Sequence, residues 1–482
     1  MTTNWFGASD PAPACTATPI AAPEHPGTIP KREARMELVY DYIGIGFGPS
    51  NLALAIATQE HAAANGQAPQ VCFLEKKPAF NWHEGMLIDG STMQISFLKD
   101  LVTLRNPASR FSFINYLNER GRLQDFINLK TFFPTREEYT DYLTWAASHF
   151  TDQTHFGEEV MAVEPFFQDG RFVAVDVLSR RADGGVSRRR ARNLVFGIGG
   201  IPVVPAPFEG LQDPRVLHSS RYRGGIEQVL AQRAGPVKVA VVGGGQSAAE
   251  IFEDLASRFD NVDATLVIRG TALKPSDDSP FVNQIFNPSF TDTIFNHSEE
   301  RRDALFSEFR NTNYSVVDTD LIESIFQRLY QQKVRGETRH QLLTNREVAH
   351  AEITDEGIEL FFHDALHERT DSQRFDVVVL ATGYRRDYHR QLLAGIEAYI
   401  DGPAVDRQYR LAMRPGSEAG VFLQGCCEDS HGLSDTLLSV LAIRSQEVVE
   451  SIFADYAQPC SCRSASVAAV APPRTPALKL AR

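Results

Sequence analysis

Two glycine-rich segments of the chain have the residue types and spacing needed to bind a phosphate. The first contains Gly44, Gly46 and Gly48, followed by Pro49, and it joins an apolar run to the helical pattern of residues 52–60. Glycines let the backbone turn tightly and approach a pyrophosphate, which then lies at the positive N-terminus of the following helix. This pattern predicts a dinucleotide site.

A carboxylate follows the first glycine segment at the position where a ribose would lie. Glu75 ends the next apolar run, residues 71–75. A carboxylate there can accept hydrogen bonds from ribose hydroxyl groups. A glycine-rich turn alone is often only a turn, so the prediction rests on the strand before it, the helix after it and Glu75 together.

The second glycine segment has similar surroundings but the opposite charge at the end of the next strand. It consists of Gly243, Gly244, Gly245, Gln246 and Ser247. It follows the apolar run 237–243, and the next run ends in Arg269 rather than in an acid. A guanidinium group can bind a 2′-phosphate through two hydrogen bonds, whereas a carboxylate would repel it. The second segment therefore favours NADPH, the alternative being that Arg269 is an exposed arginine at the start of a loop.

Two dinucleotide sites of unlike chemistry favour a flavin, FAD, in the first site and its hydride donor, NADPH, in the second. A flavin-dependent disulfide reductase also needs a reactive pair of cysteines such as Cys-x-x-Cys. The sequence has no such pair, and the adjacent Cys426 and Cys427 lie in an apolar run that indicates a core position. A hydride-transfer oxidoreductase and an oxygen-activating monooxygenase remain as alternatives.

The elements that must position these residues follow an α/β pattern. Short apolar runs alternate with amphipathic stretches such as 246–258, which predicts parallel sheets covered by helices, here two Rossmann-like domains. Residues 171–196 instead predict antiparallel strands around the turn 182–185. The basic run 187–192 within them is interpreted as a solvated edge strand protected by its charge.

The chain is expected to pass between the two domains twice. The run 193–200 leaves the FAD domain and the run 375–384 re-enters it, so the NADPH domain is an insertion, itself interrupted by a small, mainly helical substrate subdomain. The residues expected in the core of that subdomain are Phe281, Phe286, Phe290 and Phe295. The predicted division is a disordered extension at 1–36, the FAD domain at 37–205 and 376–456, the NADPH domain at 206–275 and 347–375, the substrate-binding subdomain at 276–346 and a disordered tail at 457–482.

Composition argues against several classes of protein. The 482 residues include 61 acidic and 48 basic side chains, a net charge of −13. An acidic surface argues against nucleic-acid binding and docking on acidic lipid, so phosphate groups must be met by local cations or helix N-termini. The 6 cysteines are too few for a disulfide framework and have no zinc-like spacing, which favours the reducing cytoplasm and no metal. No apolar run approaches the ~18 residues of a transmembrane helix.

Several longer motifs resemble one known family. They are Asn81-Trp82-His83-x-Gly85, residues 93–101, residues 278–283, residues 312–317, Ala381-Thr382-Gly383-Tyr384 and residues 431–439. In this order, between about residues 38 and 453, they are similar to the flavin-dependent N-hydroxylating monooxygenases of siderophore biosynthesis. Within that family the chain resembles the L-ornithine N5-monooxygenase branch. One departure is His389, because a proline often follows the Ala-Thr-Gly-Tyr segment in the family.

The resemblance implies an activity. NADPH reduces FAD, O2 then gives a C4a-hydroperoxyflavin, and the terminal amine of L-ornithine takes up its distal oxygen. The product, N5-hydroxyornithine, is used for a hydroxamate siderophore. No catalytic side chain is expected, because the protein only has to exclude water, orient the cofactors and deliver a neutral amine. The family resemblance also implies a homotetramer.

The resemblance also assigns residues to each ligand. Those expected to bind the substrate are Lys99, Asn283, Asn313 and Ser439. Those expected near FAD are Gly44, Gly46, Gly48, Pro49, Glu75, Trp82, His83, Gln94, Val160, Thr436, Leu437 and Leu438. Those expected near NADPH are Gly243, Gly244, Gly245, Gln246, Ser247, Arg269, Asn313, Tyr314 and Ser315. In the substrate set, the lysine can neutralise the carboxylate of the amino acid, while the asparagine side chains can donate to that carboxylate or accept from the α-ammonium group.

Two alternatives to ornithine hydroxylation stay open. An L-lysine N6-hydroxylase uses the same machinery for an amine that is one methylene longer. An NADPH oxidase-like flavoprotein would consume NADPH without hydroxylating anything. The presence of Lys99, Asn283 and Asn313 argues against this second alternative, because such a protein has no use for a substrate pocket.

Overall fold

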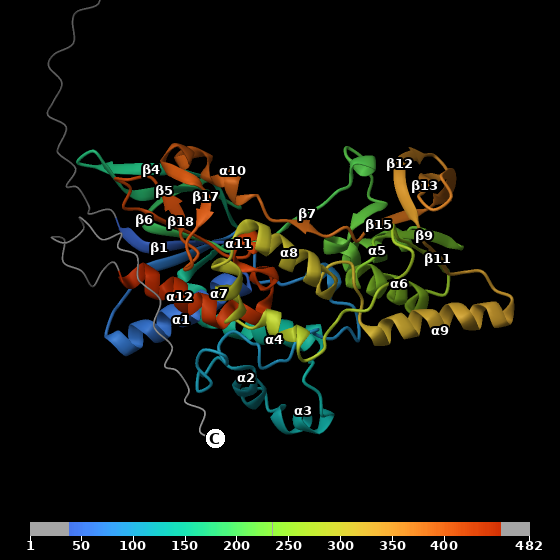
Figure 1. The fold of residues 1–482 in the computed structure, drawn as a ribbon, viewed down its shortest axis with the longest axis horizontal. Coiled ribbons are helices and arrows are strands. Elements are labelled where there is room, and N and C mark those ends of the chain that lie inside the picture. Colours follow the sequence, from blue (N-terminus) through green and yellow to red (C-terminus); the bar gives the residue numbers. More distant parts are fainter. Residues whose placement is uncertain (1–37, 234, 455–482) are drawn as a thin grey trace, which may run out of the picture. The chain divides into compact units, whose positions relative to one another are not determined.

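A computed structural model describes residues 38–233 and 235–454 of the chain. Figure 1 shows its helices and strands with the labels used below. The two segments predicted to be disordered, 1–36 and 457–482, lie outside the described residues.

The first sheet has seven strands in the order β3-β2-β1-β6-β5-β4, and β19 pairs with β6. β1 (Val39–Ile45) lies between β2 (Val71–Glu75) and β6 (Val186–Phe196) and runs parallel to both. The other strands are β3 (Thr154–Phe156), β4 (Glu158–Gln168), β5 (Arg171–Arg181) and β19 (Gly420–Leu423). Most of β2 and the second half of β1 are buried, as expected for parallel strands covered by helices.

The basic run 187–192 lies within this sheet. Its interpretation as a solvated edge strand is wrong, because β6 pairs with β1, β5 and β19. Arg189 forms an ion pair of 2.5 Å with Glu158 of β4, and Arg190 forms one of 2.6 Å with Asp176 of β5. The basic side chains are therefore neutralised by acids on neighbouring strands, which the local sequence does not indicate.

Helices α1 (Pro49–Asn65) and α12 (Leu441–Ala454) pack against each other and share one apolar core with the first sheet. α1 begins with Pro49 in its first turn, where the fixed φ of proline suits a helix. The further helices of this region are α2 (Phe113–Glu119), α3 (Leu123–Leu129), α4 (Arg136–Ala147), α10 (His389–Leu392) and α11 (Glu428–His431). β17 (Ile400–Val405) and β18 (Leu411–Met413) form a separate antiparallel pair.

The second sheet is parallel, with the strand order β11-β10-β9-β15-β8. Its strands are β8 (Val216–His218), β9 (Val237–Val242), β10 (Val262–Val267), β11 (Gln341–Leu343) and β15 (Val377–Leu380). Its helices are α5 (Tyr222–Leu230), α6 (Gln246–Arg258) and α9 (Thr319–Arg335), which contribute to its core. The parallel second sheet and the parallel strands β3, β2, β1, β6 and β19 of the first confirm the predicted α/β class with two Rossmann-like units.

The chain returns to the first unit later than predicted. The run 375–384 was expected to re-enter that unit, but β15 within it pairs with β9 and β8 of the second sheet. The crossing follows instead at β16 (Tyr384–Arg385), which pairs with the outgoing β7 (Ile201–Pro202). A strand of 4 apolar residues is compatible with either sheet, so its partners could not be read from its own sequence.

An antiparallel sheet and a helical insertion complete the second unit. The sheet consists of β12 (Arg346–Thr354), β13 (Gly357–Asp364) and β14 (Arg369–Phe375), and its apolar face packs against the second sheet. The insertion consists of η5 (Val282–Phe286), α7 (Phe290–Phe295), α8 (Glu299–Phe309) and η6 (Arg310–Thr312). Short 3-10 helices elsewhere are η1 (Glu84–Met86), η2 (Ser148–Gln153), η3 (Ala206–Phe208), η4 (Ser219–Arg221), η7 (Leu393–Tyr399), η8 (Leu433–Thr436) and η9 (Leu438–Val440).

The predicted insertion at 276–346 is helical, but its predicted extent and core differ from those observed. α9 and β11 belong to the second unit, since they pack in its core and pair with its sheet. Phe281 is 85% exposed rather than part of the core, while Ile285 and Ile294 are buried. Among the described residues no helix is long and apolar enough to cross a membrane.

Candidate functional site

The first glycine segment forms the turn from β1 to α1. Gly46 has a positive φ of 81°, and a Cβ there would lie 2.7 Å from the carbonyl oxygen of Gly197, so only glycine fits. A Cβ on Gly48 would meet nothing within 4 Å, so there is open space before the helix. No side chain caps α1, and its first N–H groups are left for a ligand. The turn therefore fits the pyrophosphate of a dinucleotide.

Glu75 lies beside this turn and is held in place by it. One carboxylate oxygen accepts a hydrogen bond of 2.7 Å from the backbone N–H of Phe47, and the other accepts one of 2.9 Å from the N–H of Lys77. A carboxylate can accept about four hydrogen bonds in all, so lone pairs remain for ribose hydroxyls. The structure thus brings the predicted carboxylate to the predicted phosphate turn.

Asn51 is a residue of this site that the sequence analysis missed. It is fully buried in the first half of α1, and its Nδ2 donates to the carbonyl oxygen of Gly46 at 2.7 Å. Its Oδ1 accepts a hydrogen bond of 2.9 Å from Nε2 of Gln424, which follows β19. A polar residue at a buried helical position was the available signal, since buried amides are nearly always hydrogen-bonded.

The second glycine segment borders a large cavity of about 2000 Å³. Gly243 has a φ of 150°, and a Cβ there would lie 2.3 Å from the carbonyl oxygen of Ala381. The predicted residues that line this cavity are Gln94, Lys99, Gly243, Gly244, Gly245, Gln246, Ser247, Arg269, Asn283, Asn313, Tyr314, Ser315, Leu437 and Ser439. The predicted residues that do not line it are Gly44, Gly46, Gly48, Pro49, Glu75, Trp82, His83, Val160, Thr436 and Leu438.

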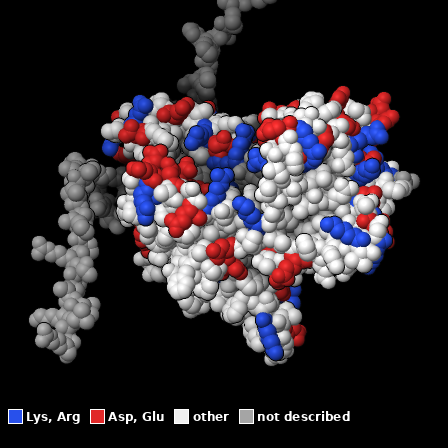
Figure 2. Space-filling model, turned by 45° about the vertical axis from the view of Figure 1, so that its right-hand side comes forward, with Lys and Arg blue, Asp and Glu red and all other residues white. Residues whose placement is uncertain are grey.

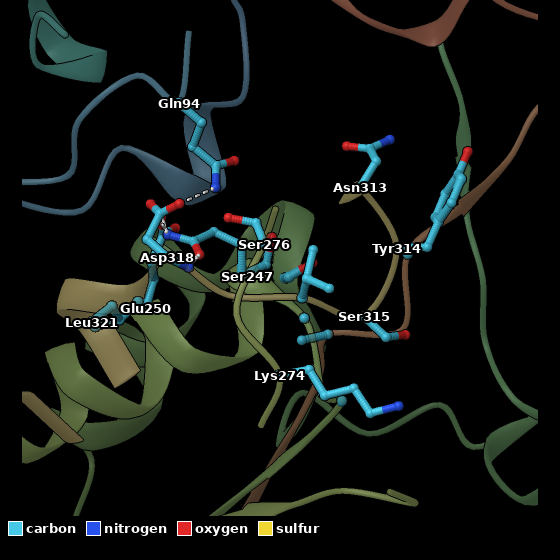
Figure 3. Close-up of a pocket in the computed structure, with 18 of the residues that line it drawn as sticks. Gln94, Ser247, Glu250, Lys274, Ser276, Asn313, Tyr314, Ser315, Asp318 and Leu321 are labelled. Atoms are coloured by element: carbon cyan, nitrogen blue, oxygen red, sulfur yellow. Dashed lines mark hydrogen bonds between the residues drawn. The ribbon is translucent and has the colours of Figure 1, made fainter. Parts of the chain in front are cut away.

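The four predicted substrate residues come from distant segments of the chain. Lys99 follows a turn before α2, Asn283 lies in η5, Asn313 follows η6 and Ser439 lies in η9. The fold brings all four to the wall of one cavity. Figure 3 shows Asn313 at this cavity, on the same side as Tyr314 and Ser315.

Two of these side chains have polar groups that can bind a ligand. The hydroxyl oxygen of Ser439 is buried and has no hydrogen-bond partner among the described residues. Partial burial lowers the pKa of Lys99, because desolvation disfavours its ammonium form. A carboxylate bound beside Lys99 would raise the pKa of this lysine and favour its charged ammonium form. Both groups are therefore available to a polar ligand in the cavity.

Two cations line the cavity wall beyond the second glycine segment. Arg269 comes just after β10 and is exposed at the cavity wall. Lys274 lies further along the same wall, and its ammonium group extends into the open space in Figure 3. On the face shown in Figure 2, basic side chains gather near the middle although the chain as a whole is acidic. Arg269 and Lys274 therefore supply positive charge at this part of the cavity wall.

A hydrogen-bonded chain connects the two units at the edge of the cavity. Nε2 of Gln94 donates to one oxygen of Asp318 at 3.1 Å, and Nε2 of Gln246 donates to the other at 3.0 Å (Figure 3). The backbone N–H of Asp318 returns a hydrogen bond of 2.8 Å to Oε1 of Gln246. Asp318 precedes α9 and was missed by the sequence analysis, because its partners are far away in the sequence.

Tyr314 anchors the segment between the insertion and α9. Its hydroxyl donates a hydrogen bond to the carboxylate of Glu428 in α11. Burial is the main cause that raises the pKa of both groups, so the phenol stays protonated at neutral pH. This contact fixes the neighbouring Asn313 and Ser315 against the first unit.

The described residues contain no cluster of His, Cys, Asp or Glu that could hold a metal ion. His431 does not line the cavity, and burial lowers its pKa to about 4. Its ring stacks on Tyr409 with a centroid distance of 4.0 Å, and its Nε2 donates to the carbonyl oxygen of Arg407 at 3.3 Å. This histidine is therefore a neutral structural residue.

Comparison with known proteins gives consistent matches over most of the chain. A family model described as L-lysine 6-monooxygenase/L-ornithine 5-monooxygenase matches residues 38–386. An L-ornithine N(5)-monooxygenase of Burkholderia cepacia is 51% identical over 403 residues, which cover 82% of this chain and 90% of that protein. The structure of an ornithine hydroxylase from Pseudomonas aeruginosa is 48% identical in sequence, with a TM-score of 0.83. The match covers 87% of this chain and 100% of that chain. An ornithine N-hydroxylase from Kutzneria sp. 744, solved with reduced FAD, NADP+ and L-ornithine, is 37% identical with a TM-score of 0.81 and the same coverage, 87% and 100%.

Proposed function

The chain belongs to the L-lysine 6-monooxygenase/L-ornithine 5-monooxygenase family, and we propose that it hydroxylates the side-chain nitrogen of L-ornithine with NADPH and O2, using FAD. One observation carries the proposal. Lys99, Asn283, Asn313 and Ser439 come together on the wall of the cavity that also contains the second glycine segment. An amino acid held there would lie beside a nicotinamide nucleotide bound at that segment, as the reaction requires.

The first glycine segment supports FAD binding. FAD, reduced by NADPH, supplies the activation of O2 and the transfer of one oxygen atom to an amine. The N-terminus of α1 after Gly48 would hold its pyrophosphate, and Glu75 would accept from its ribose. Trp82, His83, Gln94, Val160 and the run 436–438 are proposed to surround the rest of the cofactor.

The second glycine segment supports NADPH binding. Gly243, Gly244 and Gly245 leave room for its pyrophosphate at the N-terminus of α6, next to Gln246 and Ser247. Arg269 is proposed to bind the 2′-phosphate through its guanidinium group. The run 313–315 is proposed to contact the other end of the nucleotide, where Tyr314 fixes the backbone.

The substrate residues explain how one amine is selected. An amino acid that reacts at its far end must be held by its near end, which carries a carboxylate and an ammonium group. Lys99 would bind the carboxylate, and the amides of Asn283 and Asn313 would bind the α-ammonium group. Anchoring the near end fixes how far the side chain extends toward the reacting oxygen. The amine of ornithine would then be in position to react, while that of lysine would extend one methylene too far.

The lysine N6-hydroxylase and the NADPH oxidase-like flavoprotein are distinguished from this proposal by one assay. Purified protein loaded with FAD is supplied with NADPH and with ornithine or lysine in parallel, and hydroxylated product, NADPH consumption and peroxide are all measured. Ornithine should give hydroxylated product, while lysine should at most stimulate NADPH oxidation with release of peroxide. Product from lysine but not from ornithine would establish the lysine branch, and no product from either would establish the oxidase.

We further infer the cellular role and assembly of the enzyme. N5-hydroxyornithine is proposed to supply a hydroxamate siderophore, and the three unbridged cysteines among the described residues support the reducing cytoplasm, where NADPH is made. A homotetramer is supported by two exposed apolar groups. One is a stripe on α9, where Phe326, Tyr330 and Val334 are 71%, 60% and 70% exposed, and the other contains Ile127, Leu129 and Phe132. Two separate exposed apolar faces on one chain would allow a tetramer with two-fold axes.

A further inference from the structure

A buried ion pair lies beside the first glycine segment. It joins Arg444, near the start of α12, to Asp435 in η8, and their side chains are only 1% and 0% exposed. Nη1 of Arg444 donates to one carboxylate oxygen of Asp435 at 2.8 Å and to the backbone carbonyl oxygen of the same residue at 2.6 Å. The other carboxylate oxygen accepts a hydrogen bond of 2.7 Å from the N–H of Cys427. The ion pair therefore fixes both the side chain and the backbone of Asp435.

The same guanidinium group reaches the start of α1. Nη2 of Arg444 donates to the hydroxyl oxygen of Ser50 at 3.0 Å. Ser50 follows Pro49, which has no N–H, so Ser50 supplies the first backbone N–H of an uncapped helix. Among the described residues, the hydroxyl of Ser50 accepts this one hydrogen bond and donates none. Both the backbone N–H and the hydroxyl proton of Ser50 are therefore available to an anion at the start of α1.

The ion pair also closes a loop that contains proposed ligand contacts. Its two residues are the ends of the segment 435–444, and the hydrogen bond from Arg444 to the carbonyl oxygen of Asp435 joins these ends. The run 436–438, proposed to surround FAD, lies within this loop, and so does Ser439. Ser439 lines the large cavity. One side chain thus contacts both the turn proposed for the pyrophosphate and the loop proposed for the rest of the flavin.

The shape of arginine explains why this residue suits the position. Two nitrogens of its planar guanidinium group donate in different directions, Nη1 to Asp435 and Nη2 to Ser50. A lysine has a single ammonium group on a flexible stem and does not fix two partners in the same way. Asp435 neutralises the charge of Arg444, so the pair contributes direction rather than net charge. Buried ion pairs often add little net stability, because desolvation offsets their attraction.

We propose that Ser50 is a ligand of the FAD pyrophosphate and that Arg444 is the positioning residue that orients it. Because the oxygen of Ser50 faces the guanidinium group, its proton points away from Arg444 and is free for a phosphate oxygen. Through the segment 435–444, the same arginine sets the place of the flavin ring relative to the pyrophosphate. The inference rests on the proposed function only in that FAD occupies the first glycine segment.

The first experiment measures the affinity for FAD without NADPH or ornithine. Full-length protein loaded with FAD is diluted, and the fluorescence of the released flavin gives the Kd. Ser50→Ala should raise this Kd about tenfold, as expected for the loss of one hydrogen bond to a charged group. Arg444→Lys should raise it at least as much. Adding Ser50→Ala to Arg444→Lys should raise it by no more than about a further twofold, because the serine is no longer oriented.

Two results would overturn the proposal. An unchanged Kd in Ser50→Ala would exclude this serine as a ligand of the pyrophosphate, and this small substitution keeps the test valid even if Arg444→Lys does not fold. A full further tenfold rise on adding Ser50→Ala to Arg444→Lys would show that the two residues act independently.

A matched control lies on the same helix. Glu447, one turn further along α12, accepts hydrogen bonds of 3.0 and 2.9 Å from Arg407. In the part of the chain that the structure describes, the side chains of this pair make no hydrogen bond to Ser50 or Asp435. Glu447→Ala should lower the free energy of unfolding, measured in urea with saturating FAD, and leave the Kd for FAD unchanged. A rise in Kd equal to that of Arg444→Lys would show a general loss of stability and overturn the positioning role.

The last measurement tests the connection to the flavin ring. With saturating FAD, the visible circular dichroism of the bound flavin reports the surroundings of its ring. Arg444→Lys should change this spectrum, whereas Ser50→Ala and Glu447→Ala should keep that of the parent protein. An unchanged spectrum in Arg444→Lys would overturn the role of the segment 435–444. A parent protein that binds no FAD would contradict the proposed function itself, whereas a parent that binds FAD as tightly as all its variants would contradict only this inference.

Discussion

The guanidinium of Arg136 at the start of α4 donates two hydrogen bonds, of 2.7 and 2.5 Å, to the two carboxylate oxygens of Glu250 in α6. Their side chains are only 13% and 8% exposed. Glu250 also accepts from Gln246 at 2.8 Å, so the ion pair is joined to the hydrogen-bonded chain at the cavity. The position of the second glycine segment relative to the first unit therefore depends on this pair.

Removing Glu250 should destabilise the protein strongly. The substitution Glu250→Ala leaves the guanidinium of Arg136 buried without its partner, which typically costs about 3–5 kcal/mol. Urea unfolding with saturating FAD measures the loss. The exposed pair Arg180–Glu159, with side chains 54% and 43% exposed, is the matched control, and Glu159→Ala should cost at most about 1 kcal/mol. Similar losses for both substitutions would show that the pair in the interior has no special role.

Removing Arg269 should weaken the binding of NADPH and leave the binding of NADH unchanged. A charge-assisted contact to the 2′-phosphate is worth about 1.5–3 kcal/mol, so Arg269→Ala should raise the KM for NADPH by about 10- to 100-fold. NADH has no 2′-phosphate and serves as the control. Steady-state NAD(P)H oxidation with ornithine present checks this, and equal losses with the two coenzymes would contradict the assignment.

Removing Lys99 should impair the use of ornithine without impairing the reduction of the flavin. Lys99→Ala should weaken ornithine use strongly while flavin reduction by NADPH stays near normal, because hydride transfer needs no substrate carboxylate. Rapid-mixing reduction and product yield are measured side by side. Lys333→Ala, an exposed lysine in α9, removes the same charge and should change neither. Loss of reduction together with hydroxylation, or unchanged ornithine affinity, would exclude Lys99 as the carboxylate anchor.

Replacing Ser439 should affect the ligand and not the fold. Its buried hydroxyl has no partner among the described residues, so Ser439→Ala removes no hydrogen bond that a described side chain or backbone group makes. The free energy of unfolding without ornithine should stay the same or rise slightly, because an unpaired buried polar group is costly. The KM for ornithine should rise. A large drop in stability without ligand would indicate a structural role instead.

His431 should make the protein sensitive to mild acid. Its pKa is lowered to about 4 by burial, below the usual value of ~6.5, so the unfolded chain binds the proton more readily than the folded protein. This contribution to stability is present above pH ~6.5 and is lost as the pH falls toward ~4, a change of about 3 kcal/mol. The parent protein should therefore have a lower urea midpoint at pH 5 than at pH 7.5. In His431→Gln the difference between the two midpoints should be smaller. His350→Gln, at an exposed position, should keep the full difference of the parent protein.

Much of the site could be predicted from the sequence because its signals are local. Gly44 lies near the end of a strand, and Gly46 and Gly48 form the turn to the helix that follows it; the conformation of a turn is set by its own residues. Glu75 and Arg269 each stand at or just beyond the end of the next strand, which places them at the same edge of their sheets as the turns. The alternation of short apolar runs with amphipathic helices also determined the α/β class.

Only the tertiary structure decided the features that depend on residues far apart in the sequence. β15 has apolar residues that suit either sheet, and its pairing with β8 and β9 follows from the path of the whole chain. The arginines of β6 look like a solvated edge until the acids of β4 and β5 are in place beside them. The pair Arg136–Glu250 joins positions separated by 114 residues, so no local pattern marks it. Burial, partners and pKa values are properties of the assembled surroundings, whereas turns, helix ends and strand periodicity belong to the chain itself.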